Sequence, residues 1–144
     1  MILLTPDLRF ALRANDITRR AAAQRGQPEP DPVPVVKLFN PLGAATWLAT
    51  ELDEDDDTLF GLADLGFGCP ELGYFSLSEI ASLRLPFGLG IERDIGFSTT
   101  VRLSVWADTA RRVGSILQAQ AIIWRIESAP VPEIPTDPSQ GKGG

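Results

Sequence analysis

The chain has 144 residues, a net charge of −6 and 44% hydrophobic residues. These values exclude a wholly disordered protein and predict one globular domain over residues 1–127, large enough to bury a core. The absence of histidine and the single cysteine exclude a Ser-His-Asp triad, a Cys-His pair and an internal disulfide framework. No apolar run approaches the roughly 18 residues of a membrane helix, and no signal-peptide pattern is present, so we expect a cytoplasmic protein.

The charges are distributed unevenly along the chain. Residues 1–27 carry five arginines against two acidic residues, whereas residues 28–60 carry eight acidic residues against Lys37 alone. A protein that binds nucleic acid directly needs a basic face, which this pattern does not predict. We therefore expect no direct nucleic-acid binding.

A helix is predicted from Thr5 to about Arg25. Thr5 suits the N-cap, Pro6 suits the first helical position, and Asp7 complements the helix dipole. The second half of the helix is basic and allows two interpretations. It is either a solvated helix end or an arginine face for an acidic or phosphate partner. That arginine face would contain Arg13, Arg19, Arg20 and Arg25.

A proline-rich connector follows the helix at residues 26–34. Its prolines at alternate positions exclude a helix and predict an extended, polyproline-like segment. The next apolar and β-branched runs predict an antiparallel meander. Its strands are expected at residues 35–40, 46–52, 58–65 and 73–77.

The side chains of residues 46–52 should alternate between the two faces of the sheet. Trp47 and Glu51 are expected on one face, and Leu52 on the other. Gly61, in the third strand, is a candidate β-bulge because glycine inside a strand often marks an irregularity.

A short helix is expected after the fourth strand, capped by Ser76 or Ser78 and ending near Leu83. Ser76 and Glu79 have the spacing of a capping box, which favours this assignment. Residues 94–97 are predicted to form a last short strand.

Residues 100–113 show apolar residues at three- and four-residue spacing, which predicts a helix, although alternation in its first part also allows a strand. The pattern of residues 115–127 does not distinguish a helix from a strand. Residues 128–144 are expected to form a disordered tail. The predicted fold class is α+β: an N-terminal helix packed on a curved antiparallel sheet of four or five strands, with one or two further helices.

An acidic loop joins the second and third predicted strands and contains Asp53, Glu54, Asp55, Asp56 and Asp57. Three of its aspartates, at 53, 55 and 57, match the first three alternating ligand positions of a calcium-binding loop, and Asp64 matches its last ligand position. Thr58, however, occupies the position where that loop requires glycine, and strands flank the segment instead of helices. We expect a solvated hairpin loop, with no metal site and no cofactor.

Four segments carry a family resemblance, which spans about residues 1–110 and does not include the connector at residues 26–34. Taken together, they resemble the bacterial family called domain of unknown function 2958. The family has no established activity, and the resemblance implies an association with plasmids and other mobile elements. The four segments are Thr46–Glu51, Leu59–Gly66, Glu71–Glu79 and Leu89–Asp94.

The charged run Glu92, Arg93 and Asp94 is the first candidate binding site, with Tyr74 and Glu71 as further members. Two interpretations remain open. In the first, Arg93 forms a bidentate pair with a carboxylate such as Glu71 or Glu79 and locks the loop onto the sheet. In the second, the run binds a ligand. Because Tyr74 adjoins Phe75 in a strand, one of these two rings is expected at the surface.

The sequence therefore favours a small, acidic, non-enzymatic protein that binds a protein partner through the acidic loop or the arginine face. One alternative is an acidic mimic of DNA that blocks a defence nuclease. This alternative requires residues 51–57 and the glutamates at 71, 79 and 92 to lie on one surface. Another alternative is a hydrolase that uses a carboxylate pair around Glu92 and Asp94 inside a pocket.

Overall fold

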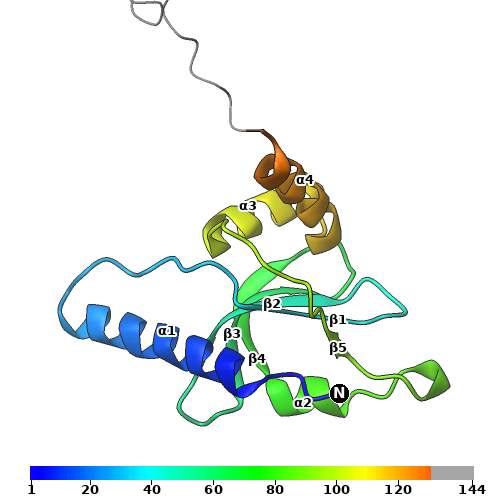
Figure 1. The fold of residues 1–144 in the computed structure, drawn as a ribbon, viewed down its shortest axis with the longest axis horizontal. Helices are drawn as coiled ribbons and strands as arrows, with labels where there is room; N and C mark the ends of the chain where they lie inside the picture. The colour runs from blue at the N-terminus through cyan, green and yellow to red at the C-terminus, as the bar shows by residue number, and fades with distance from the viewer. Residues whose placement is uncertain (131–144) are drawn as a thin grey trace, which may run out of the picture.

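The computed structural model describes residues 1–130 and contains a five-stranded antiparallel sheet between two layers of helices (Figure 1). One layer contains α1 (Pro6–Gln24) and α2 (Leu77–Ser82). The other contains α3 (Leu103–Val113) and α4 (Ile116–Ser128). The α+β fold class is confirmed, with the N-terminal helix packed on an antiparallel sheet and further helices beyond it.

The strands follow the order β4-β3-β2-β1-β5 across the sheet. The first four form the predicted meander, and β5 pairs with β1 at the far edge. The bounds are β1 (Val36–Phe39), β2 (Thr46–Leu52), β3 (Thr58–Asp64), β4 (Glu71–Ser76) and β5 (Glu92–Arg93).

The predicted strand at residues 94–97 is wrong, because the last strand ends at Arg93. The amide of Asp94 still donates to Lys37 O at 3.0 Å. Its carboxylate then accepts from Gly96 N at 3.1 Å, which turns the chain away from the sheet. A short aspartate-to-backbone bond of this kind competes with strand pairing.

The helix caps follow the sequence signals closely. Thr5 Oγ1 accepts from Leu8 N at the start of α1. Ser76, the first of the two candidate caps, accepts from Glu79 N at the start of α2. A short 3-10 turn at Pro86–Gly88 follows α2.

The undetermined segment at residues 115–127 is helical. Gly114 ends α3 in the left-handed region (φ 79°), and Ser115 caps α4 at once. Helix α4 buries Ile116, Ala119 and Ile123, the spacing of one helical face. It continues to Ser128, into the first residue of the predicted tail. Residues 131–144 lie outside the described part of the chain.

Strand β2 lies at the centre of the fold, and all seven of its residues are buried. Two apolar cores therefore form, one on each face of the sheet. The core below the sheet is covered by α1 and α2, and it contains Trp47, Ala49 and Leu52. The core above the sheet is covered by α3 and α4, and it contains Leu48 and Trp106.

A β-bulge interrupts β2 between Ala49 and Glu51. Because a bulge inserts one extra residue, the alternation of side chains reverses beyond it. Leu52 therefore packs with Trp47 below the sheet, and Glu51 turns to the upper face beside Phe60. The expected placement of Glu51 and Leu52 is wrong for this reason.

Gly61 pairs with Ala49, directly before the bulge, and is not itself the bulged residue. A Cβ atom at position 61 would lie 1.8 Å from Leu48 O. Glycine is required here because the two strand backbones approach too closely for any side chain.

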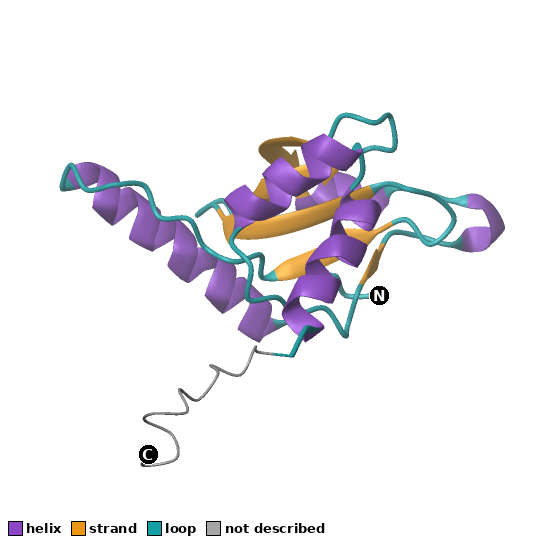
Figure 2. Cartoon of the chain, turned by 90° about the horizontal axis from the view of Figure 1, so that it is seen from above, coloured by secondary structure: helices purple, strands orange, loops and turns teal. Residues whose placement is uncertain are grey.

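Helix α1 takes the place of a strand beside the end of β2. Strand β1 pairs only as far as Ala49, so the later β2 carbonyls have no strand partner on that side. Asn15 donates to Thr50 O at 2.9 Å, and Arg13 donates to Leu52 O at 2.6 Å. Figure 2 shows α1 running out past the sheet on this side.

The connector at residues 26–34 is extended, as predicted, and contains no helix or strand beyond the turn that ends α1. It passes from α1 to the opposite layer, where it is fixed to the start of α3. Asp31 accepts from Ser104 N at 3.1 Å and from the Ser104 hydroxyl, and Leu103 N donates to Pro32 O at 2.9 Å. Among residues 1–130, none of the helices has the length and apolar character needed to cross a bilayer.

Replacing Gly61 with alanine should lower the free energy of unfolding by about 2–3 kcal/mol, because the added methyl would collide with the β2 main chain. Urea denaturation measures this loss. Gly73→Ala is the matched control, since Gly73 pairs with Gly61 and a Cβ there meets nothing within 4 Å. Equal stabilities of the two variants would contradict the close approach.

Candidate functional site

The candidate residues taken from the sequence do not converge. Glu71 and Tyr74 belong to β4, whereas Glu92 and Arg93 belong to β5. These are the two outer strands of the sheet, so the residues lie at opposite edges. Tyr74 is 68% exposed, while Phe75 packs on the lower core, which confirms that one ring of this pair is at the surface.

Arg93 fastens the N-terminal segment to β5. Its guanidinium donates to Ile2 O at 2.8 Å and to Leu3 O at 3.0 Å. Its backbone N–H also approaches Met1 Sδ at 3.2 Å. The expected ion pair with a β4 or α2 glutamate is wrong, because backbone carbonyls occupy the guanidinium instead. Arg93 therefore has the locking role of the first interpretation, with a different partner.

Asp94 belongs to a buried polar group that the sequence did not suggest. Its carboxylate lies 3.5 Å from Lys37 Nζ, and the same Nζ donates to Gln120 Oε1 at 2.7 Å. Within the described chain, the buried Nε2 of Gln120 has no hydrogen-bond partner. The group links β1, the residue that follows β5, and α4. The presence of Lys37 inside a predicted strand was the sequence feature that could have indicated this polar group.

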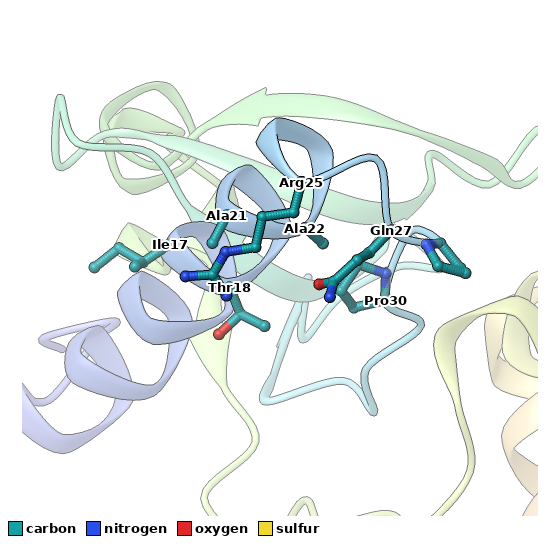
Figure 3. Close-up of a pocket in the computed structure, with 8 residues that line it drawn as sticks. Ile17, Thr18, Ala21, Ala22, Arg25, Gln27 and Pro30 are labelled. Carbon is teal, nitrogen blue, oxygen red and sulfur yellow. The ribbon is translucent and has the colours of Figure 1, made fainter.

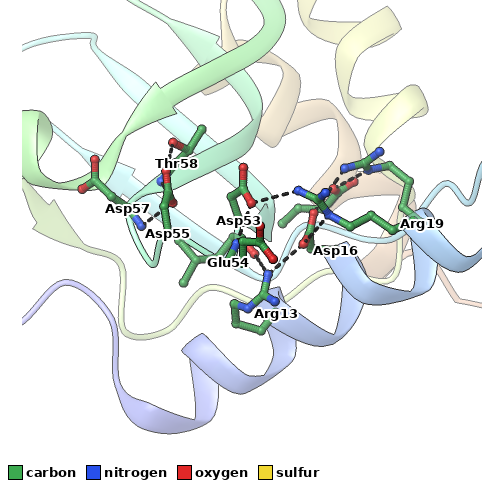
Figure 4. A network of polar contacts seen from close by, with 11 residues as sticks. Arg13, Asp16, Arg19, Asp53, Glu54, Asp55, Asp57 and Thr58 are labelled. Carbon is green, nitrogen blue, oxygen red and sulfur yellow. Dashed lines mark hydrogen bonds and ion pairs between the residues drawn. The ribbon is translucent and has the colours of Figure 1, made fainter.

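The arginine face of α1 and the acidic residues of β2 and its loop bind each other (Figure 4). Each surface was a candidate for binding an external partner, yet most of the arginines are paired with acidic residues of the same molecule. The ion pairs are Arg9–Asp56 at 2.6 Å, Arg19–Glu51 at 2.7 Å and Arg20–Asp53 at 2.8 Å.

Asp16 is the centre of this network and is 2% exposed. It accepts hydrogen bonds from Arg13 at 2.7 Å, Arg19 at 3.2 Å and Arg20 at 3.0 Å. Burial raises the pKa of Asp16, but the hydrogen bonds from Arg13 and Arg20 outweigh it and the pKa is lowered overall. The sequence contained a signal that we missed: these arginines lie three or four residues from Asp16 on one helix.

The acidic loop is organised by its own carboxylates. Asp55 accepts from the Thr58 hydroxyl at 2.6 Å and from Thr58 N at 2.8 Å, and these bonds lower its pKa. Asp57 accepts from Ser76 Oγ at 2.7 Å and Ser78 N at 2.8 Å, which lowers its pKa and caps α2. The loop therefore closes a turn and fixes a helix.

Two adjoining hollows share Glu51 and Phe60, and we call their union the β4 groove. The smaller, about 170 Å³, lies against Tyr74 and the arginine network. The larger, about 310 Å³, lies between the connector and the start of α3, beside Leu72. The Phe60 and Tyr74 rings pack with centroids 5.1 Å apart. The bulge in β2 places Glu51 in this groove, which is why the sequence did not predict it.

A separate hollow of about 560 Å³ lies between the last turns of α1 and the connector (Figure 3). The Arg25 side chain runs along the helix toward Thr18, and Gln27 and Pro30 of the connector lie on the other side. Arg25 is the member of the predicted arginine face that forms no ion pair within the described residues.

The pKa shifts in the network of α1 and the acidic loop all stabilise the charged forms of the groups. The hydrogen bond to Glu51 raises the pKa of Arg19, and the hydrogen bond to Asp16 raises that of Arg20. The pKa values of the carboxyl groups of Asp16, Asp55 and Asp57, in contrast, are lowered. A general acid needs a carboxyl pKa raised toward neutrality, so these groups are suited to ion pairing and hydrogen bonding.

A family model described as protein of unknown function (DUF2958) matches residues 3–117. The chain belongs to this family. The match includes the connector and reaches the first residues of α4, beyond the extent of the resemblance noted from the sequence. No curated protein and no solved structure shows a significant match to the chain.

Replacing Asp16 with asparagine should lower the free energy of unfolding by about 2–3 kcal/mol, because the arginines lose the carboxylate that holds them together. The loss stays below that of a fully buried ion pair, since the arginines are partly exposed to water. Thermal and urea denaturation measure it. Asp53→Asn, which removes one partly exposed ion pair, is expected to cost less than about 1 kcal/mol. Equal losses would show that Asp16 is not the centre.

Replacing Arg93 with alanine should cost about 1–2 kcal/mol, because Ile2 O and Leu3 O lose their donor. Amide hydrogen exchange should become faster at Leu3 and Leu4, whereas exchange in β2 stays protected. Arg84→Ala, at an exposed arginine between α2 and β5, provides the control. Unchanged exchange at the N-terminal segment would refute the locking role.

Proposed function

We propose that this DUF2958 protein is a small, non-enzymatic interaction module that binds a protein partner through the β4 groove. The observation that carries the proposal is Tyr74, which is 68% exposed and packs on Phe60 beside Glu51. Exposed tyrosines next to a hollow are common anchor points in protein interfaces. The ion pairs of α1 support one wall of the groove and hold it in place.

The proposed surface differs from the two that the sequence favoured. The arginines of α1 are held by Asp16, Glu51, Asp53 and Asp56, so a partner would have to break internal ion pairs to reach them. Breaking the pairs of Asp16 and Glu51 is costly because both carboxylates are buried, whereas the Arg9–Asp56 and Arg20–Asp53 pairs are partly exposed and weaker. Contact with Tyr74 needs no such rearrangement, because its ring is already exposed.

The arrangement of the acidic side chains speaks against a mimic of DNA. That function requires the carboxylates to lie on one surface at regular spacing. Glu71 and Glu92 instead lie on the two opposite outer strands, and Glu51 is buried in an ion pair with Arg19.

A hydrolase with a carboxylate pair at Glu92 and Asp94 also finds little support. Asp94 accepts a hydrogen bond from Gly96 N and lies beside Lys37. The carboxylates of Glu92 and Asp94 lie at the β5 edge of the sheet, and the β4 groove lies toward the opposite edge. The proposed module acts in the bacterial cytoplasm, an expectation that rests on composition and on the lack of a signal-peptide pattern. The family resemblance supports a place close to conjugation or anti-defence genes.

Immobilised full-length protein should retain a defined partner from a host lysate, and the purified partner should bind directly. Tyr74→Ala should weaken that direct binding at least about tenfold, a typical effect of losing an aromatic anchor. Phe10→Ala is the matched control, since Phe10 is 77% exposed on α1 and lies outside the groove. Equal binding by both variants would exclude the groove as the interaction site.

A further inference from the structure

Exposed strand edges invite pairing with other chains, and this fold closes most of its edges with specific contacts. Beside the end of β2, Asn15 and Arg13 of α1 occupy the carbonyls that β1 does not reach. At the opposite side, β5 has only two residues. The outward-lying N–H of Arg93 there meets Met1 Sδ, and its guanidinium holds Ile2 and Leu3.

The outer edge of β4 has no such closure. Leu77 N donates to Asp57 O at 2.9 Å, which fixes how the hydrogen bonds alternate along the strand. Gly73 and Phe75 then face β3, and the N–H and C=O groups of Leu72 and Tyr74 point outward. Across residues 1–130, these outward groups make no backbone hydrogen bond.

The sequence of β4 has few of the usual protective features, its one charge being Glu71 at the first position. Its six residues, Glu71–Ser76, contain no proline and no lysine, and its pairing with β3 is regular throughout. Such a regular, weakly protected edge can accept a further strand through main-chain hydrogen bonds. The side chains of Leu72 and Tyr74 lie on the face of the sheet that carries the β4 groove.

The charge of the groove indicates what the added strand carries. Glu29, Asp31 and Glu51 line the larger hollow beside Leu72, whereas Arg19 and Arg20 line the smaller one. Arg19 engages Glu51 and Ser104 engages Asp31, so among the described residues Glu29 is the carboxylate of this set that has no ion pair or hydrogen bond. The remaining walls of the larger hollow are largely apolar, formed by proline, phenylalanine and leucine side chains. A lysine or arginine suits this combination, because its aliphatic stem packs on the apolar walls while its head meets the exposed carboxylate of Glu29.

We propose that the outer edge of β4 binds an extended segment of a partner protein as a sixth strand, with a lysine or arginine of that segment over the β4 groove. This inference rests on the proposed function and specifies the conformation and charge of the partner at the same site. Alternate side chains of the added strand face the groove, so the basic residue occupies one position of a period-two pattern.

Random peptides of about ten residues, displayed on phage and selected on the full-length protein, provide the test. The enriched sequences should contain alternating β-branched residues, a lysine or arginine at one position and no proline. Glu29→Lys should weaken binding of a selected peptide at least about tenfold, because it reverses a charge in the groove. Selection of acidic peptides, or of peptides that lack a basic residue, would overturn the proposal.

The backbone contact is tested separately at Leu72. Leu72→Pro removes an N–H that points outward and should abolish peptide binding, whereas Leu72→Ala should change it by less than about threefold. Circular dichroism and thermal melting check that both variants fold. If the proline variant does not fold, N-methylation of alternate amides in the peptide tests the same hydrogen bonds. Strand addition predicts that methylation of the set facing β4 abolishes binding and that methylation of the other set is tolerated. Binding that survives methylation of each set in turn would overturn strand addition.

The outcomes also separate this inference from the function on which it rests. Tyr74-dependent binding of a partner without strand-like peptides would overturn the sixth strand and leave the interaction module intact. Absence of any Tyr74-dependent partner would overturn the proposed function itself. A concentration-dependent dimer that Leu72→Pro dissolves, seen by analytical ultracentrifugation, would show that a second copy occupies the edge and would also overturn the proposal.

Discussion

The fold depends on how the end of β2 is completed. Strand β1 is too short to pair with the whole of β2, and the leftover carbonyls are buried groups that need donors. Helix α1 provides them from Asn15 and Arg13, and Asp16 holds the surrounding arginines in position. Helix α1 therefore completes the hydrogen bonding of the sheet and also covers its lower core. Its position determines where the connector begins and where the arginines that line the β4 groove lie.

Most of the architecture could be predicted from the sequence because its signals are local. The Thr5 and Ser76 caps, the alternate prolines and the β-branched runs each act within a few residues. The elements that were predicted wrongly or left undetermined are also explained by nearby residues. Asp94 bonds to Gly96 N and ends pairing where apolar residues suggested a strand, and the sequence of α4 is apolar on too many sides to show one clear period.

The site was much harder to predict because it depends on one irregularity. Period-two alternation assigns Glu51 to the face of Trp47, and only the bulge at Thr50 moves it to the other face. Likewise, the arginine face and the acidic loop looked like two partner surfaces, since a sequence cannot show that α1 packs beside β2. The pairing of Arg19 with Glu51 becomes visible only when both positions are known.

The connector gives the molecule a mechanical property. The two apolar cores lie on opposite faces of the sheet and share no buried side chain. The segment from Gly26 to Pro34 passes round the sheet and is bonded to Ser104 through Asp31, so it joins the helix of one layer to the first helix of the other. A displacement of the end of α1 would therefore be transmitted along the connector to the start of α3. The connector thus couples the two helical layers, which have no buried side chain in common.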